Sequence, residues 1–272
     1  MKRYTWRIGV IEIVMLAVSL VFIVPVYVLV NLSIRRLGDP LSPLVPTLHA
    51  TWENYARAWT EGRLGWALIN SAMVTGASVV LLIGISSLAA YVLARVASGW
   101  SRLAYIFLIV GLLIPIQLGF IPLYRMFLSL HLLSLWALVI FYAGLQVPFS
   151  VFLYAAFIRA LPRDYEEAAA LDGCGPLRAF WSVVFPLLSP VTASIAIINV
   201  IVIWNDFMTP LLYLSGGRQQ TVPVAVFGFV GQYTSQWSVV FAALVIGMAP
   251  VLALFFALQG RVMKGFTAGV KG

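Results

Sequence analysis

Six stretches of apolar residues recur along this 272-residue chain, and each is long enough to cross a lipid bilayer. A transmembrane helix needs about 20 apolar residues, because the hydrocarbon core is roughly 30 Å thick. Hydrophobic residues make up 62% of the chain and charged residues only 10%, whereas about a quarter of a soluble domain is charged. The predicted spans cover residues 8–32, 66–93, 103–127, 135–157, 184–207 and 237–258. The sequence therefore predicts an all-α integral membrane protein with six transmembrane helices and no large soluble domain.

The first apolar stretch could be mistaken for a signal peptide, because Lys2, Arg3 and Arg7 precede it. Its length exceeds that of a signal-peptide core, and no small-x-small cleavage pattern follows at a suitable distance. We therefore expect an uncleaved first span. Proline residues inside this and other spans are tolerable, because neighbouring helices can satisfy the freed carbonyl groups.

The distribution of basic residues predicts the orientation. Six spans place both termini on one side of the membrane. That side carries 11 Lys and Arg residues, which are Lys2, Arg3, Arg7, Arg95, Arg102, Arg159, Arg163, Arg178, Arg261, Lys264 and Lys271. The other side carries 6, which are Arg35, Arg36, Arg57, Arg63, Arg125 and Arg218. Because basic residues concentrate on the cytoplasmic side, we expect both termini in the cytoplasm, with Arg35 and Arg36 as a local exception.

Several classes of function find no support in the composition. The net charge of +8 is explained by basic residues at the membrane surface, so we expect no nucleic-acid partner. The single cysteine, Cys174, excludes an intramolecular disulfide and a cysteine-based zinc cluster, and His49 and His131 are typical of ordinary loop histidines. We therefore predict no metal, no cofactor and no catalytic residue. No GxxxxGK[ST] string occurs, so any ATP must be hydrolysed by a partner.

Two other kinds of membrane protein are weaker alternatives. A stand-alone secondary carrier or channel usually needs ionisable groups near the bilayer midplane or an internal repeat, and Glu12 and Asp206 lie near span ends. An intramembrane enzyme would need paired mid-span Asp residues, a His–Glu metal motif or a Ser–His arrangement. None of these patterns is visible in the sequence.

The polar stretch 161–173 is the most informative part of the chain. Asp164 is a favourable N-cap, and Glu167 three residues later completes a capping-box pattern. Gly173 can adopt the left-handed conformation that ends a helix, and Pro176 suits the first turn of a second helix. The local pattern predicts a short helix from Asp164 to Gly173. Such a helix is marginal alone, so it either forms a plain surface turn or needs a partner surface.

The string Glu167-Ala168-Ala169-Ala170-Leu171-Asp172-Gly173 is followed by Phe180, Phe185-Pro186 and Pro190. It resembles the "EAA" motif of bacterial ABC importer permeases. The resemblance implies the type I permease fold, in which this helix is a coupling helix that docks on a cytoplasmic nucleotide-binding subunit. It implies that Glu167 pairs with a basic group on the ATPase and that Gly173 permits the bend between the two helices. The implied contact set is Glu166, Glu167, Ala168, Ala169, Asp172 and Gly173.

Further motifs are similar to the carbohydrate-uptake branch of that family, which includes the smaller permease subunit of the maltose system. These motifs are Asn70-Ser71, Ala90-Tyr91 with Arg95, Pro122-Leu123-Tyr124, Trp204-Asn205-Asp206-Phe207 and the tail Lys264-Gly265-Phe266-Thr267-Ala268-Gly269-Val270-Lys271-Gly272. The tail departs from the branch pattern GLTAGAVKG at Phe266 and lacks one alanine before Val270. The departure affects how the tail packs more than which surface it meets.

The resemblance implies the partners and the location of the chain. The partners are a second permease subunit in a heterodimer, two ATP-binding cassette subunits, an extracytoplasmic solute-binding protein and the lipid bilayer. The location is the cytoplasmic membrane of a bacterium or archaeon. We expect residues 1–63 to hold the first span and an external loop, residues 64–260 the permease core, and residues 261–272 a cytoplasmic tail.

The sequence leaves the substrate path open. Trp204, Asn205 and Asp206 fit either an interfacial anchor with a turn or an outer gate that contacts the binding protein. Gln117 and Asn199 are polar residues within spans, and they could line the path or bond between helices. A sugar or oligosaccharide is the expected substrate, with a glycerol phosphodiester or phosphate as the alternative.

Overall fold

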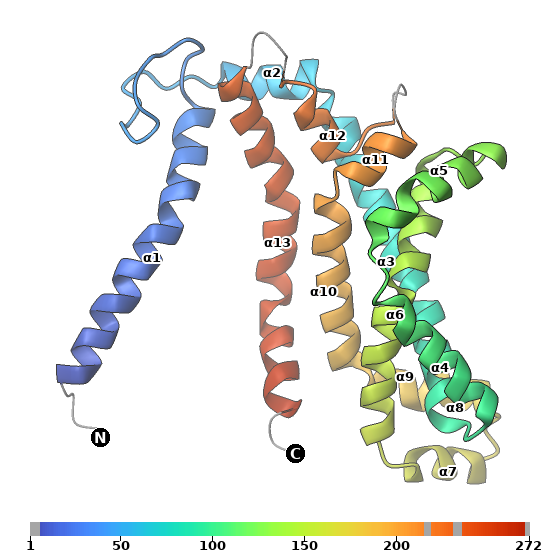
Figure 1. Cartoon of the computed structure of the whole chain (residues 1–272). Coiled ribbons are helices and arrows are strands. Elements are labelled where there is room, and N and C mark those ends of the chain that lie inside the picture. The colour runs from blue at the N-terminus through green and yellow to red at the C-terminus, as the bar shows by residue number, and fades with distance from the viewer. Residues whose placement is uncertain (1–5, 215–218, 231–235, 270–272) are drawn as a thin grey trace. The chain divides into compact units, whose positions relative to one another are not determined.

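The computed structural model describes residues 6–214, 219–230 and 236–269, and every regular element named here is helical (Figure 1). The chain forms two compact units. Unit 1 comprises residues 1–67 and 222–250, and unit 2 comprises residues 68–221 and 251–272. The long helices α3 (Leu64–Arg95) and α13 (Trp237–Gly269) each belong in part to both units.

Unit 1 begins with α1 (Trp6–Ser33), which confirms the first predicted apolar helix. Its most apolar window has no residue buried within the chain, as expected for a helix that faces lipid or another subunit. The unit also contains α2 (Glu53–Glu61) and α12 (Val222–Phe227).

The loop that follows α1 is organised by buried polar side chains. The Arg35 side chain donates hydrogen bonds to the carbonyl oxygens of Leu41 at 2.6 Å and Ser42 at 3.1 Å, and Arg35 is 2% exposed. Asn54 closes the loop from α2 by donating to the carbonyl oxygens of Ser33 at 2.9 Å and Arg35 at 2.7 Å. Arg35, an exception to the charge bias, is therefore used to satisfy buried backbone carbonyls.

Unit 2 contains the straight helices that the sequence predicts well. Helix α3 extends the predicted span 66–93 by two residues at each end, and α6 (Leu135–Ala160) includes the predicted span 135–157. One face of α3 is lined by small or apolar buried residues, which are Ser71, Thr75, Ser78, Leu82, Ser86 and Ala90. Small side chains on one helix face allow close helix packing in a membrane. This stripe explains why so apolar a helix carries several serine residues.

The predicted span 103–127 is not one straight helix. It consists of α4 (Gly99–Gly111), the 3-10 turn η1 (Ile116–Gly119) and α5 (Phe120–Ser129), and the two parts are bent by 92°. Pro115 occupies the N-cap position of η1 with extended φ and ψ of −61° and 121°. Proline lacks an N–H and disfavours helical conformation in the residue before it, so the helix stops at the break.

The predicted span 184–207 is also shorter than expected. Helix α10 (Ser189–Asn205) is preceded by α8 (Pro176–Ala179), the π-helical turn η2 (Phe180–Val184) and α9 (Phe185–Leu187). The segment before α10 is bent from it by 75° at Leu188, between two prolines that each open a helical piece. The bend allows the residues before Leu188 to run across the end of unit 2.

Helix α13 continues to Gly269, past the predicted end of the last span at residue 258. The proposed boundary at residues 260 and 261 therefore falls inside a helix. The last three residues of the predicted tail lie outside the described residues.

Four described helices are long and apolar enough to cross a membrane, and the two bent pairs pass the same test. In unit 2, α7 (Asp164–Leu171) lies at the end where α4 begins, and α5 and α11 (Met208–Tyr213) lie at the opposite end (Figure 1). One apolar cluster includes residues of α5, α6 and α11. A second includes residues of α3, α6, η2 and α10.

Candidate functional site

The helix α7 is confirmed close to its predicted position, but it begins differently from the prediction. Arg163 is the N-cap, its own φ and ψ of −72° and −17° are helical, and it makes no side-chain capping bond. The carbonyl of Arg163 accepts the N–H groups of Glu166 at 2.9 Å and Glu167 at 3.0 Å. The predicted N-cap at Asp164, with its capping box to Glu167, is therefore wrong. Asp164 is the first helical residue, where its charge still favours the positive end of the helix dipole.

The end of α7 matches the prediction in detail. Gly173 has a φ of +79°, and its N–H bonds to the carbonyl of Ala170 at 3.0 Å. The N–H of Cys174 bonds to the carbonyl of Ala169 at 2.9 Å. These two bonds form a Schellman motif, which satisfies carbonyls that a helix end otherwise leaves free. An added Cβ at Gly173 would meet no atom within 4 Å, so backbone conformation rather than space favours glycine here.

A largely shielded ion pair ties α7 to the end of α3. The Nε of Arg95 lies 2.8 Å from Oε1 of Glu166, and the two side chains are 11% and 17% exposed. The Nη2 of Arg95 donates to the carbonyl of Leu161 at 3.0 Å, and Nη2 of Arg163 donates to the carbonyl of Arg95 at 3.2 Å. Glu166, one of the residues expected to face the ATPase, thus has its carboxylate turned toward its own chain.

The sequence reasoning missed the Arg95–Glu166 pair. The two residues are 71 positions apart, and no local periodicity connects them. The only available signal was that Arg95 was one of the residues carrying the family resemblance, at the end of the preceding span.

The outer face of α7 leaves apolar side chains uncovered. Leu171 is 91% exposed and Leu177, just after the turn, is 64% exposed, while Ala169 on the inner face is buried. Glu167, Ala168 and Asp172 are also exposed. These exposed leucines and acidic groups make this segment a candidate contact surface for a partner.

The inner face of α7 rests on the π-helical turn η2. Phe180 of that turn is fully buried, and its ring lies 5.0 Å from Tyr91 and 4.9 Å from Trp181 between centroids. Aromatic contacts at such distances are favourable. The helix is therefore mounted on a packed aromatic cluster that connects α3 with the segment leading to α10.

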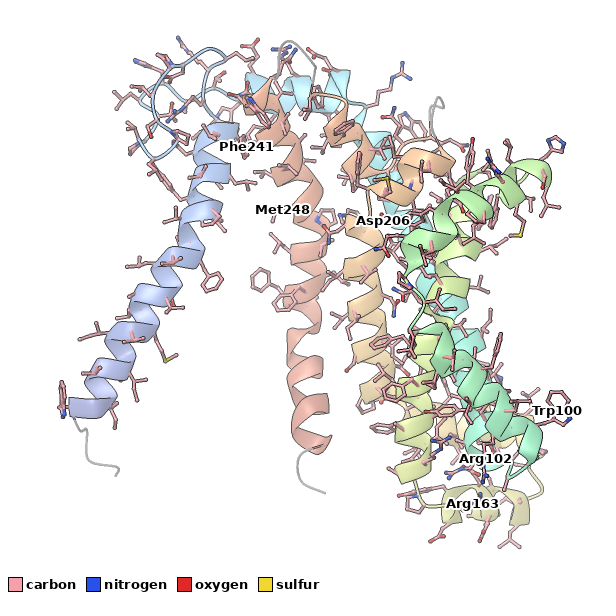
Figure 2. All side chains as sticks on the ribbon, viewed as in Figure 1. Trp100, Arg102, Arg163, Asp206, Phe241 and Met248 are labelled. Carbon is pink, nitrogen blue, oxygen red and sulfur yellow. The ribbon has the colours of Figure 1, made fainter. Side chains whose placement is uncertain are left out.

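At the opposite end of unit 2, Asp206 organises a turn (Figure 2). Its Oδ2 accepts the hydroxyl of Tyr142 at 2.9 Å, and its Oδ1 accepts the N–H groups of Met208 at 3.0 Å and Thr209 at 3.4 Å. Trp204 is 8% exposed. Asn205 is exposed and donates to the carbonyl of Ile201 at 2.8 Å in its own helix. Asp206 thus precedes α11 and accepts its first two N–H groups, and the structure brings Trp204 into the packed region rather than onto the surface.

The two polar residues predicted within spans have different surroundings. Gln117 is exposed in the turn η1, at the break between α4 and α5. Asn199 is fully buried on α10 and donates to the carbonyl of Ile195 at 2.8 Å, so this bond lies within its own helix. Its Oδ1 has no partner among the described residues. The structure does not bring Gln117 and Asn199 together with the α7 surface.

Comparison with known proteins agrees with this architecture. The chain is 36% identical over 271 residues to the melibiose/raffinose/stachyose import permease protein MelC of Bacillus subtilis, covering 98% of each chain. It is 33% identical over 255 residues to AmyC of Thermoanaerobacterium thermosulfurigenes, a probable permease protein of a transport system for starch degradation products, covering 93% of each.

A solved structure shares the fold. It is a chain of a bacterial ABC transporter involved in the import of the acidic polysaccharide alginate, with a TM-score of 0.80 and 21% sequence identity. The match covers 96% of the present chain and 99% of the other. Residues 83–267, which include α7 and the Arg95–Glu166 pair, match the family of binding-protein-dependent transport system inner membrane components. This chain, a multi-pass membrane protein with the type I ABC importer permease fold, belongs to that family.

Proposed function

We propose that the chain is one permease subunit of an ATP-driven importer for a sugar or oligosaccharide, and that α7 is its coupling helix. The observation that carries the proposal is the two-sided construction of α7. Its inner side is fixed by Arg95, η2 and the turn at Gly173, while Leu171 and Glu167 remain uncovered on its outer side. A helix fixed to the spans and uncovered outside can transmit a push from a partner.

The proposed topology has six spans with both termini in the cytoplasm. It counts each bent helix pair as one span, which both pairs permit by length and composition. The charge bias of 11 to 6 basic residues supports the same orientation, so that α7 faces the cytoplasm. A second permease subunit, two ATP-binding subunits and a solute-binding protein complete the proposed assembly.

In the proposed mechanism, ATP binding closes the two ATP-binding subunits onto each other. The part of α7 that docks in a groove of an ATP-binding subunit moves with that subunit. This part consists of Glu167, Ala168, Ala169, Asp172 and Gly173. Glu166 acts by positioning, because its carboxylate holds Arg95. The contacts of α7 with Arg95 and η2 pass the movement to the spans, which alternate between inward-open and outward-open states. Asp206 and its neighbours Trp204 and Asn205 are proposed to shape the outer end, where the binding protein delivers the sugar.

The substrate proposal rests on relatives. Of the relatives named above, MelC is an import permease for melibiose, raffinose and stachyose, and AmyC is a probable permease for starch degradation products. Gln117 at the break of the third span and Asn199 on α10 are the proposed polar residues of the path. The Oδ1 of Asn199 has no partner among the described residues, so it is free to accept a hydrogen bond from the substrate.

Reconstitution of the chain with its partner subunits in vesicles tests the proposal. We expect uptake of labelled oligosaccharide that requires ATP and the binding protein, and no uptake by the chain alone. Glu167→Arg should abolish uptake while membrane insertion stays intact. The proposal fails if the chain alone transports sugar, if glycerol phosphate is the transported compound, or if Glu167→Arg transports normally.

A further inference from the structure

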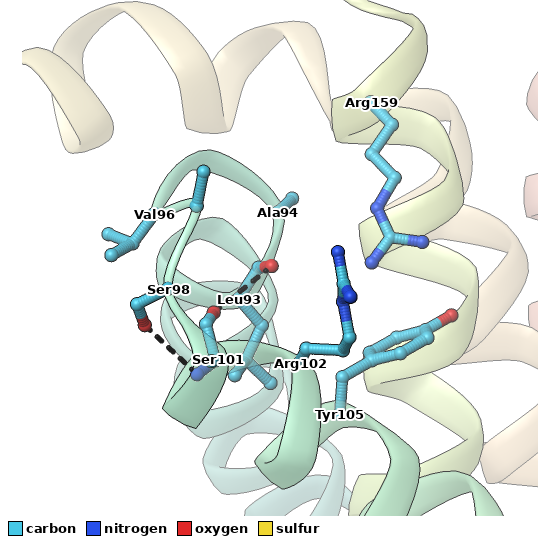
Figure 3. Close-up of a pocket in the computed structure, with 10 residues that line it drawn as sticks. Leu93, Ala94, Val96, Ser98, Ser101, Arg102, Tyr105 and Arg159 are labelled. Carbon is cyan, nitrogen blue, oxygen red and sulfur yellow. Dashed lines mark hydrogen bonds between the residues drawn. The ribbon is translucent and has the colours of Figure 1, made fainter.

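A cavity of about 380 Å³ opens in unit 2 at the end where α7 lies, and the residues that line it belong to other elements (Figure 3). It lies between the end of α3, the start of α4 and the end of α6. Its lining includes the connection 96–98, together with Arg102 and Tyr105 of α4 and Arg159 of α6. The proposed function uses none of these residues, so the cavity needs its own explanation.

Two guanidinium groups reach into this cavity. The Cζ of Arg159 lies 4.4 Å from the centre of the Tyr105 ring, in the geometry of a cation–π contact. Arg102, one turn before Tyr105 on α4, extends toward the same space (Figure 3). In the described part of the chain, neither arginine forms an ion pair, and the nearby Glu166 is already bound to Arg95. Two like charges held together without an acidic partner favour the binding of an anion.

The two serine side chains of the wall are already engaged in hydrogen bonds. Oγ of Ser98 accepts the N–H of Ser101 at 3.1 Å, and Oγ of Ser101 donates to the carbonyl of Leu93 at 3.3 Å (Figure 3). These bonds fix the connection between α3 and α4. The two guanidinium groups and the Tyr105 hydroxyl are the side-chain donors of this wall that the serine bonds leave for a ligand, and guanidinium forks match the oxygens of a phosphate group.

The surface beside the cavity is suited to acyl chains. Four apolar side chains on α4 repeat at helical spacing, and Leu103 is 57%, Ile106 50%, Phe107 76% and Val110 49% exposed. Trp100, 81% exposed at the start of α4, fits the headgroup level, where tryptophan is enriched (Figure 2). A free phosphate would use the arginines alone, whereas a phospholipid would also cover this apolar stripe.

We propose that this cavity binds the headgroup of an anionic phospholipid, with Arg102 and Arg159 on its phosphate and the acyl chains along α4. Basic pockets between membrane helices on the cytoplasmic side are known sites for such headgroups. Only the assignment to the cytoplasmic leaflet rests on the proposed function. The bound lipid would hold together the end of α3, the start of α4 and the end of α6, next to the Arg95 contact that holds α7.

Native mass spectrometry of the purified full-length chain tests the proposal, with dioleoyl phosphatidylglycerol, dioleoyl phosphatidylcholine and inorganic phosphate as separate probes. We expect phosphatidylglycerol to be retained on the order of tenfold better than phosphatidylcholine. Arg102→Gln with Arg159→Gln should remove that preference. The matched control is Arg36→Gln with Arg125→Gln, which removes the same charge from exposed arginines elsewhere and should keep the preference. Tyr105→Phe should keep it, and Tyr105→Leu should weaken it.

Three results would overturn the proposal. One is an unchanged lipid preference in the Arg102 and Arg159 double variant, with thermal unfolding showing that the variant is folded. Another is occupancy by inorganic phosphate equal to that by phosphatidylglycerol, which would make this a site for a free anion. The third is release of the lipid when the partner subunits bind, which would make it a protein interface. The experiment measures lipid binding and not transport. A failure of the proposed sugar uptake would therefore not change its outcome.

Discussion

Unit 2 carries a short helix at each end, and the two are built in opposite ways. The six-residue helix α11 buries Thr209, Pro210 and Tyr213, and it begins at a turn made by Asp206. The eight-residue helix α7 buries only Ala169 and is held by an ion pair and a Schellman motif. Packing fixes α11 inside its own chain. Discrete polar contacts and the contact of its inner face with η2 fix α7, while Leu171 on its outer face stays exposed.

The largest effect on stability should come from a substitution in the packed helix α11. Tyr213 is 2% exposed, and its ring lies 5.5 Å from Phe127 and 5.3 Å from Phe141 between centroids. Tyr213→Ala leaves a cavity there and should lower the free energy of unfolding by about 3 kcal/mol, measured by thermal unfolding in detergent. Tyr165→Ala on α7, where the side chain is 49% exposed, is the matched control and should have little effect. Similar losses in both variants would contradict the contrast between the two helices.

The next effect should come from the ion pair that fixes α7. Glu166→Gln leaves the Arg95 guanidinium without its carboxylate in a largely shielded position. We expect a loss of about 2 kcal/mol, between the values for exposed and buried pairs, seen as faster hydrogen exchange in residues 164–174. The control is Glu167→Gln, at the next residue, which is exposed. This substitution should leave hydrogen exchange in residues 164–174 unchanged. Equal exchange in the two variants would mean that the Arg95 contact does not hold the helix.

A smaller effect should follow from the turn that ends α7. At a φ of +79°, Gly173→Ala places a Cβ in the left-handed region and should cost about 1 kcal/mol. Local hydrogen exchange of the amides of residues 173 and 174 measures that cost. Gly144→Ala within α6, where an added Cβ also meets nothing within 4 Å, should be neutral or slightly stabilising. A neutral result at both glycines would argue against a conformational requirement at Gly173.

The smallest effect on stability should come from the exposed face. Leu171→Ser changes a side chain that is 91% exposed, so the free energy of unfolding should stay within about 0.5 kcal/mol. The same substitution should weaken binding of the ATP-binding subunits about tenfold, measured with the purified components. A large loss of stability with unchanged binding would place Leu171 in the fold of the chain instead.

The sequence predicts those parts of the molecule that depend on neighbours along the chain. Long apolar runs identify α1, α3 and α6, and a glycine after an alanine-rich helix identifies the left-handed turn at Gly173. These features arise from local solvent preference and backbone conformation. For the same reason, the predicted all-α fold agrees with the structure, in which four described helices are long and apolar enough to cross a membrane.

The features that sequence reasoning missed depend on distant contacts. The prolines in the third and fifth spans could have been accommodated within straight helices, and only the surrounding packing selects bends of 92° and 75°. The pairing of Arg95 with Glu166 and the gathering of Arg102 with Arg159 join residues from different helices. The wrong N-cap at Asp164 has a local origin, because the first residue of a helix is uncertain by one or two positions in sequence-based prediction. In the structure the carbonyl of Arg163 accepts the first helical hydrogen bonds, so the helix begins one residue earlier.

The central claim is that a partner ATPase covers the outer face of α7. Cysteine accessibility tests it most directly, with Leu171→Cys in a Cys174→Ser background and Leu48→Cys, 83% exposed in the loop after α1, as the control. We predict that a membrane-impermeant maleimide labels Cys at position 171 in the purified chain and that bound ATP-binding subunits slow this labelling at least tenfold, while labelling at position 48 is unchanged. Equal labelling at position 171 with and without the bound subunits would contradict the claim.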